Sequence, residues 1–397
     1  AAGKEIHLWE TRGPDGGAYD ENYFKNIGEV TPTENGGSYT YSVTVKPYSI
    51  LTASTIGLTP AEYHKADASE RTILELPYTD DYEYADYPAD YLSSRGSAPR
   101  YTTDEGGAFE VENGMLVQQI TPGLKAKEWG WTPDPTTNFG DDRWYDYSVS
   151  ANVTYAPSEN KESNYAGVGL RYTQGNAGAS GYWLKLTEGG SWSLWENSDV
   201  LKSGTTSADT SAPVALKIEA VGRTVRCWAN DEQLCEYTAE GTVLGAGRAA
   251  FYSSYDRNGF DDLVIAPAEG ESAYITRVDN TDLAFSYAGE WEHNTMSSFK
   301  NYKRTISHGA EGAYLTVDFE GTGIILTGAQ KGDTVVSIDV DGKTVNKEYA
   351  VSKIGNRQSF VLINGLEQGK HTLKLADAWR TFRCRCRFRC HTSRSYQ

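Results

Sequence analysis

The sequence is poor in several features that would place it in a common protein class. None of its apolar runs approaches the ~20 residues that a membrane-spanning helix needs. Helical periodicity is scarce, and the strand-helix alternation of a parallel α/β barrel is missing. Cations are outnumbered, with 37 Lys and Arg against 54 Asp and Glu. These absences exclude a membrane-spanning helix and an α/β barrel. They also argue against a nucleic-acid surface, which needs cations to displace counterions from phosphates.

Aromatic residues and glycine are abundant instead. The chain has 27 Tyr, 10 Trp and 40 Gly, and many short segments alternate apolar and polar residues between Gly, Asn and Asp turns. Aromatic side chains pack well on a pleated surface, and these turn residues suit tight connections, so we predict an all-β chain. The net charge of -17 suits a secreted protein that must stay soluble. No signal peptide precedes Ala1, so we expect the start of an exported protein to be missing.

Residues 1–57 read as the closing part of a β-sandwich. The run SYTYSVTVKPYSILTASTIG, Ser38 to Gly57, predicts a strand, a corner at Pro47 and another strand. A ribbon of two or three strands is marginal in water on its own, so we expect its partner strands to lie upstream of Ala1. Residues 58–107 are dense in Tyr, Asp and Pro and predict an ordered connection that packs along a neighbour.

Two further sandwiches are predicted downstream. Roughly a dozen alternating strands in residues 108–267 indicate two packed antiparallel sheets, a jelly roll. Residues 273–376 show the same alternation and predict a third β-sandwich. The composition then changes abruptly, because residues 377–397 contain six Arg and one Asp. We interpret this tail as aberrant, the product of a shifted reading frame or an artificial end, with a functional basic arm as the alternative.

The cysteines fall into two groups. Cys227 and Cys235 flank an Asn-Asp turn, and on paired hairpin strands they could form a disulfide or remain two small thiols. The other three lie in the tail, in the run CRCRFRCH, whose spacing matches no structural zinc site. Neither group therefore predicts a metal centre.

Aromatic loops offer the best candidates for a binding site. No Gly-x-Ser-x-Gly elbow or phosphate-binding loop is present, and the six His show no zinc-ligand pairing. Sugars present apolar faces between hydroxyl groups, so their sites combine aromatic rings with polar side chains. We select Trp129, Trp131, Tyr255 and Arg257 as carbohydrate-binding candidates. The alternative is that the two Trp residues cover a neighbouring domain.

Calcium is the second possible ligand. The runs TDDYEY and GFDDLV place Asp81 and Asp261 where the first and last strands of a jelly roll would meet. Calcium takes six to eight oxygen ligands, and carboxylates supply them. The alternative is that these adjacent acids are simply solvated.

Seven segments resemble, in their order along the chain, the region after the catalytic barrel in galactosylceramidase-type enzymes, glycoside hydrolase family 59. They are HLWET, VTPTENGGSYTYSVTVKPYSILTASTI, LPYTDDYEYADYP, GAFEVENGML, GDDRWYDYSVSANVTYA, GVGLRY and GFDDLVIAP. The resemblance implies an upstream (β/α)8 barrel with two catalytic Glu residues, a β-sandwich built from both chain ends, and a lectin-like, concanavalin-like jelly roll. It also implies a calcium site to which Asp81 and Asp261 correspond.

The third sandwich departs from that family, which ends after the jelly roll. Its segments FEGTGIILTG and IDVDGK resemble galactose-binding-like modules appended to bacterial hydrolases. Such modules bind glycans or serve as spacers. The resemblance therefore implies a second carbohydrate-binding module.

The resulting hypothesis is an accessory carbohydrate-binding region of a secreted bacterial glycoside hydrolase that acts on β-galactosides. Its expected partners are glycans or glycolipids with terminal β-galactose and the catalytic barrel of the same parent chain. This chain alone would then show no turnover. The alternative is a stand-alone lectin or adhesion protein. A third hypothesis makes the jelly roll a lyase or hydrolase, although no pair of acids and no Tyr or His base stands out.

Overall fold

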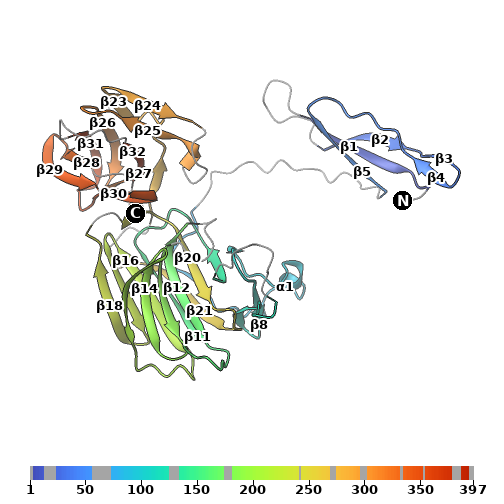
Figure 1. Cartoon of the computed structure of the whole chain (residues 1–397), viewed down its shortest axis with the longest axis horizontal. Helices are drawn as coiled ribbons and strands as arrows, with labels where there is room; N and C mark the ends of the chain where they lie inside the picture. The colour runs from blue at the N-terminus through green and yellow to red at the C-terminus, as the bar shows by residue number, and fades with distance from the viewer. Residues whose placement is uncertain are drawn as a thin grey trace. The chain divides into compact units, whose positions relative to one another are not determined.

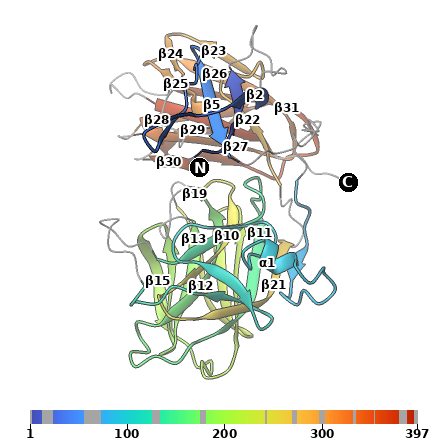
Figure 2. The same cartoon turned by 90° about the vertical axis from the view of Figure 1, so that its right-hand side faces the viewer.

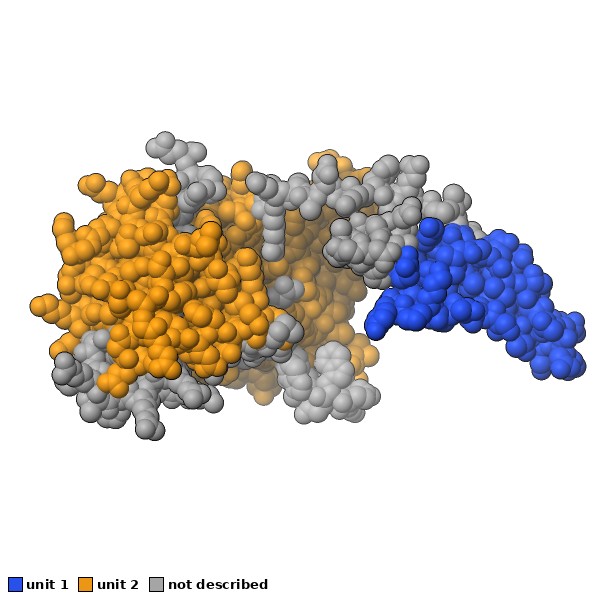
Figure 3. Space-filling model, turned by 90° about the horizontal axis from the view of Figure 1, so that it is seen from above, with its two compact units in different colours: residues 1–72 blue, residues 73–397 orange. Residues whose placement is uncertain are grey.

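A computed structural model describes most of the chain and confirms the all-β class. It covers residues 3–12, 24–55, 73–124, 134–173, 181–240, 243–268, 274–295, 302–330, 334–351, 354–377 and 386–392. Within these ranges the helical segments are short, α1 (Tyr91–Ser94) and η1 (Tyr302–Arg304). No helix of the described residues is long and apolar enough to cross a membrane. The chain divides into two compact units, residues 1–72 and 73–397, which Figure 3 colours separately.

The first unit is a three-stranded antiparallel sheet with a small hairpin. The sheet has the order β2-β1-β5, and β3 pairs with β4. The bounds are β1 (Ile6–Arg12), β2 (Lys25–Val30), β3 (Thr33–Asn35), β4 (Ser38–Thr40) and β5 (Ser49–Ser54). The central strand β1 buries Trp9, whereas Val45 and Ile50 are 56% and 69% exposed. The strand predicted from Ser38 to Val45 ends at Thr40, because the following residues pair with no strand.

Two packed sheets form the predicted jelly roll (Figure 1). The seven-stranded sheet has the order β15-β14-β13-β12-β20-β10-β7. Its strands are β7 (Thr102–Asp104), β10 (Thr136–Phe139), β12 (Tyr165–Tyr172), β13 (Tyr182–Thr187), β14 (Ser191–Glu196), β15 (Asp199–Thr205) and β20 (Arg248–Ser253). The β7 strand comes from the segment predicted as a connection, so part of that segment belongs to the sheet.

The opposing sheet has the order β18-β17-β16-β11-β21-β9-β8, with β6 paired to β21. Its strands are β6 (Tyr78–Asp80), β8 (Phe109–Glu112), β9 (Met115–Gln118), β11 (Tyr147–Thr154), β16 (Val214–Val221), β17 (Thr224–Ala229), β18 (Glu232–Thr238) and β21 (Gly259–Pro267). The alternation of apolar and polar residues along each strand determines which side chains form the core. In β16, Val214, Leu216 and Ile218 are fully buried. Burying each such side chain contributes about 1.5–3 kcal/mol.

The hairpin of β17 and β18 brings Cys227 and Cys235, the first pair of cysteines, next to each other. Cys227 and Cys235 are direct partners across the two strands, and both are free thiols. Burial raises the pKa of the Cys227 thiol, while the hydrogen bond with Cys227 lowers the pKa of Cys235. The predicted closeness is therefore present in the thiol form.

The β-sandwich predicted as the third of the chain follows the jelly roll, and we call it the second sandwich of this unit. One sheet has the order β23-β26-β31-β28-β29 and the other β19-β30-β27-β32-β25-β24, with β22 paired to β32. The strands are β19 (Val243–Leu244), β22 (Thr276–Val278), β23 (Phe285–Ala288), β24 (Trp291–Asn294), β25 (Ile306–Gly309), β26 (Tyr314–Gly321), β27 (Ile324–Gln330), β28 (Thr334–Val340), β29 (Lys343–Val351), β30 (Ile354–Ile363), β31 (Gly369–Asp377) and β32 (Cys386–Thr392). The tail thus supplies β32 between β25 and β27; its aberrant origin stays a prediction.

The two sandwiches of the second unit are joined by a main-chain pairing. The β19 strand lies between the jelly-roll strands β18 and β20 in the sequence but pairs with β30 of the second sandwich (Figure 2). Tyr145, Ala246, Ile275 and Ile325 form a buried cluster around this junction. We call this pairing and its cluster the junction.

Candidate functional site

An aromatic cluster lies on the face of the seven-stranded sheet that points away from the jelly-roll core. Strand alternation places Ala166, Val168 and Leu170 of β12 in the core. The opposite face carries a separate cluster, to which β12, β13, β14 and β20 all contribute. Its aromatic members are Tyr165, Tyr172, Trp183, Trp195 and Tyr252. We call this surface the aromatic face.

The rings of the aromatic face stack on one another. The Trp183 ring lies 4.7 Å from that of Tyr252 and 5.2 Å from that of Trp195, centroid to centroid, with nearly parallel planes in both pairs. Trp183 is 3% exposed and Tyr252 is fully buried, whereas Trp195 is only partly buried. Buried rings hold the geometry, and Trp195 provides the accessible ring.

Glycine in β12 makes room for this stack. Gly169 pairs with Trp183 on one side and with Ala250 on the other. A Cβ atom at Gly169 would lie 2.5 Å from Cε2 of Tyr252, well inside van der Waals contact. The missing side chain therefore lets the Tyr252 ring lie over the strand.

Carboxylates and cations border the aromatic face. The Tyr172 hydroxyl donates to Oε2 of Glu105 at 2.9 Å, and the Tyr165 hydroxyl donates to Oδ1 of Asp134. The Lys185 ammonium lies 3.9 Å from the centroid of the Tyr165 ring. Burial lowers the pKa of Lys185, and burial together with Asp134 raises the pKa of Tyr165. The border thus combines acceptors and donors around stacked rings.

Arg248 extends this polar border at the β10 side. Its Nη1 donates to Oδ1 of Asn138 at 3.3 Å, and Nδ2 of Asn138 donates to Oε1 of Glu105 at 3.1 Å. The buried Nε of Arg248 has no hydrogen-bond partner among the described residues. The arginine therefore belongs to a polar network with Asn138 and Glu105 at this border.

The central strands of the aromatic face carry no acid. The sequences of β12, β13 and β20 are YAGVGLRY, YWLKLT and RAAFYS, without Asp or Glu. Hydrolysis of a glycosidic bond needs two carboxylates that flank it. This composition suits stacking and hydrogen bonding to a ligand, and it provides no paired acids in the middle of the face.

The predicted carbohydrate-binding residues are only partly brought together. Trp129 and Trp131 lie outside the described residues. Tyr255 is half-buried, and burial together with the Asp134 carboxylate raises its pKa. Arg257 points elsewhere, because its guanidinium pairs with Glu112 and Gln119 beside β8 and β9.

Sequence reasoning missed Trp183, Trp195 and Tyr252. The available signal was the run GYWLKLTEGGSWSLWEN, in which Trp occupies both phases of the two-residue period. A strand with one face in the core needs large apolar residues in one phase only. Aromatic residues in both phases indicate that the second face is also covered or binds a ligand.

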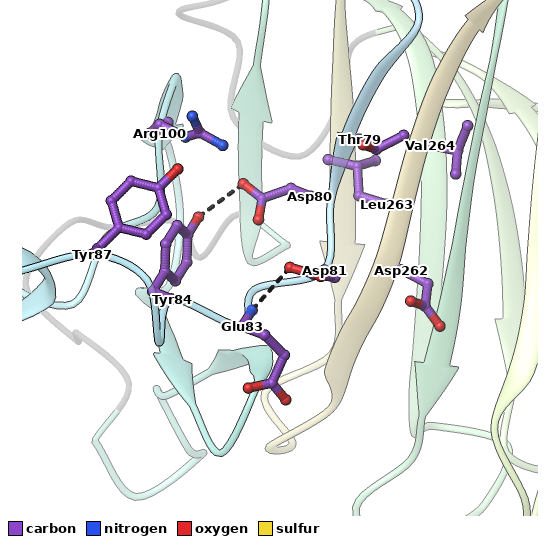
Figure 4. Close-up of a pocket in the computed structure, with 10 residues that line it drawn as sticks. All are labelled: Thr79, Asp80, Asp81, Glu83, Tyr84, Tyr87, Arg100, Asp262, Leu263 and Val264. Atoms are coloured by element: carbon purple, nitrogen blue, oxygen red, sulfur yellow. Dashed lines mark hydrogen bonds between the residues drawn. The ribbon is translucent and has the colours of Figure 1, made fainter.

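The two predicted calcium ligands lie close together, as the pairing of β6 with β21 requires. Leu263 pairs with Asp80, which places the adjacent acids side by side. Burial and the carboxylates of Asp262, Glu83 and Asp81 raise the pKa of Asp261. In Figure 4, Oδ1 of Asp81 accepts from the Glu83 N–H at 3.1 Å. The described His, Cys, Asp and Glu residues nevertheless form no group of three that could hold a metal ion.

No protein-family model matches the sequence, and no curated protein matches it. Solved structures with a similar fold include the carbohydrate-binding module CBM66 from Bacillus subtilis (13% identity, TM-score 0.34, 42% of this chain and 94% of that one). Others are the lumenal domain of VIP36 bound to Ca2+ and Man3GlcNAc (10%, 0.34, 51% and 92%) and a lichenase from a mouse hindgut metagenome (11%, 0.34, 48% and 99%). At these identities and TM-scores the similarities carry no functional argument.

Proposed function

We propose that this chain is a carbohydrate-binding region and that the aromatic face is its glycan site. The observation that carries the proposal is a stack of aromatic rings on the sheet face that points away from the core, bordered by carboxylates and cations. Aromatic rings stack on the apolar faces of sugars, while carboxylates, amides and Arg satisfy the hydroxyl groups.

Replacing Trp195 tests the site. Because Trp195 is partly buried at the edge of the stack, Trp195→Ala should keep the fold and weaken glycan binding about tenfold, the loss expected for one sugar-stacking ring. The measurement is a glycan array on the full chain, followed by titration with the best glycan. Trp228→Ala is the matched control, since Trp228 is a half-buried Trp of the other sheet with Lys217 near its ring. Equal binding by both variants would contradict the proposal.

The parent protein is the finer part of the proposal. We infer a secreted bacterial glycoside hydrolase of the galactosylceramidase type, which acts on β-galactosides and uses this region to hold galactose-terminated glycans or glycolipids. The sequence resemblance supports it, and so do the exposed Val45 and Ile50 of the first unit, which an upstream polypeptide would cover. Hydrolysis of an aryl β-galactoside by the parent is the deciding assay.

A stand-alone lectin remains the second candidate, since the aromatic face would serve it equally well. The DNA immediately upstream of Ala1 distinguishes the two. Strand-helix repeats there support the hydrolase parent, whereas a signal peptide directly before Ala1 supports the lectin.

Calcium enters the proposal through the resemblance alone. Asp81 and Asp261 would hold the ion with neighbouring carboxylates, whose mutual repulsion a divalent cation would relieve. If so, millimolar CaCl2 should raise the thermal midpoint of the full chain, and Asp261→Asn should abolish that rise. Asp231→Asn, in the exposed β17–β18 turn, is the control and should keep it.

A further inference from the structure

A cavity of about 330 Å³ lies away from the aromatic face, beside the pairing of β6 with β21. One wall comes from the strands through Thr79, Asp80, Leu263 and Val264, and the other comes from the loop that follows β6 (Figure 4). Ligand pockets span about 300–1,000 Å³, so this cavity suits one small ring better than an extended chain.

Tyrosine rings form the loop wall of this cavity. Tyr84, Tyr87 and Tyr91 make a three-ring cluster, with centroid distances of 5.0 Å for Tyr84 to Tyr87 and 4.5 Å for Tyr87 to Tyr91. Tyr84 and Tyr87 line the cavity, and the Tyr91 ring contacts both of them. The rings are braced against one another and present a preformed aromatic surface.

Arg100 adds an unused donor. Its guanidinium lies 5.4 Å from the centroid of the Tyr87 ring and lines the cavity. Its Nε is buried and has no hydrogen-bond partner within the part of the chain that the structure describes. A buried donor without a partner costs free energy unless a ligand or water accepts a hydrogen bond from it. Arg95 differs, because it donates to the carbonyls of Ala98 and Pro99.

Carboxylates complete the cavity. Asp80 is buried and satisfied: Oδ2 accepts from the hydroxyls of Tyr78 at 2.9 Å and Tyr84 at 2.8 Å, and Oδ1 accepts from the Tyr82 N–H at 3.0 Å. The exposed acids Asp81, Glu83 and Asp262 line the opening. They offer acceptors opposite the arginine donor.

We infer that this tyrosine cavity binds one neutral hexose residue of a glycan, at a site separate from the aromatic face. An aromatic wall, an arginine donor and carboxylate acceptors match the apolar face and the hydroxyl groups of a pyranose ring. Four carboxylates against one guanidinium disfavour acidic sugars. The inference names a second site, so it can fail while the aromatic face still binds.

The test is saturation-transfer NMR and titration of the full chain with methyl β-D-galactopyranoside, methyl β-D-glucopyranoside and methyl α-D-mannopyranoside. The Trp195→Ala background weakens the aromatic face, so a loss caused by a further substitution in the cavity reports binding there. In that background at least one glycoside should still bind, and Arg100→Gln and Tyr87→Leu should each weaken it at least about tenfold. Arg226→Gln is the charge-matched control, because Arg226 pairs with Glu219 and Glu236 on the far hairpin.

The outcomes are decisive in both directions. Loss of binding in Arg100→Gln and Tyr87→Leu, with an unchanged thermal midpoint and an unchanged Arg226→Gln control, supports the cavity. If Tyr87→Leu misfolds, Arg100→Gln and Glu83→Gln decide alone, since both side chains are at the surface of the cavity. The inference is overturned if no glycoside binds in the Trp195→Ala background. It is also overturned if galacturonate or methyl galactosaminide binds better than every neutral glycoside.

Discussion

A single histidine couples one turn of the second sandwich to pH. Nδ1 of His371 lies 2.7 Å from Oδ2 of Asp341, and Nε2 lies 2.8 Å from the Glu367 carbonyl. Both ring nitrogens face acceptors, so only the protonated ring can donate to both. The hydrogen bond with Asp341 raises the pKa of His371, and the same bond lowers the pKa of Asp341.

The sign of the pH dependence follows from these directions. The raised pKa of His371 gives stability that is complete below 6.5, its ordinary value, and disappears as the pH rises through the folded value. The lowered pKa of Asp341 gives stability that is complete above 3.8 and disappears as the pH falls through the folded value. We expect the difference in free energy of unfolding between the chain and its His371→Gln variant to be largest at about pH 5 and to shrink toward pH 8. Urea unfolding across this range is the measurement, and a pH-independent difference would contradict the prediction. In an Asp341→Asn background the trend should flatten.

Individual site residues were the least predictable part of the molecule. Asp81 and Asp261 could be placed near each other because the first and last strands of a jelly roll are neighbours. The contact between Trp183 and Tyr252 could not be predicted. Alternation with a period of two assigns residues to two faces of a strand, but it does not tell which residues of neighbouring strands come into contact. The partner of Arg257 could not be predicted either: an Arg in an aromatic loop suggested a ligand, and the structure pairs it with Glu112.

At the scale of elements, the aromatic face depends on a glycine inside a strand. Gly169→Ala would place a methyl group 2.5 Å from Tyr252 Cε2 and 2.9 Å from the Tyr182 carbonyl oxygen. We expect it to displace the Tyr252 ring from Trp183, to lower the free energy of unfolding by about 1–3 kcal/mol and to weaken glycan binding. Near-UV circular dichroism measures the ring displacement, thermal unfolding the stability, and titration with the best glycan the binding.

Gly123→Ala is the matched control for that substitution. A Cβ at Gly123 meets nothing within 4 Å, so the variant should keep the stability and the near-UV spectrum of the unchanged chain. Equal behaviour of the two alanine variants would show that the β12 backbone has space for a side chain, contrary to the geometry described above.

Strands were predictable where one face is buried and the other is not. In β16 the alternation of VALKIEAV matches buried and half-exposed positions residue by residue. Prediction failed after Thr40, where YSVTV alternates but the described residues form no strand. Alternation reports a preference for a pleated surface; a strand also needs a neighbour that supplies its hydrogen bonds.

At the scale of the whole molecule, we expect the junction to make the two sandwiches of residues 73–397 unfold together. Ile325 is 4% exposed and packs against Tyr145 and Ile275, and Arg277 donates to Asp142 at 2.6 Å across the same boundary. We expect calorimetry of the full chain to show one transition for this unit. Ile325→Ser should split it into two, because it removes apolar burial at the boundary. Val345→Ser, at a 56% exposed position, should leave the transition whole.

The pairing of β19 with β30 has a consequence for how this architecture can change over time. The two residues of β19 pair with two residues of β30 through main-chain amide and carbonyl groups, which every amino acid except proline supplies in the same form. Substitutions in β19 that keep this main-chain pairing can therefore accumulate, whereas loss of the apolar cluster around Ile325 would still weaken the junction. The orientation between the two sandwiches would be inherited through the backbone, and divergent descendants should keep that angle long after their sequences have ceased to resemble one another.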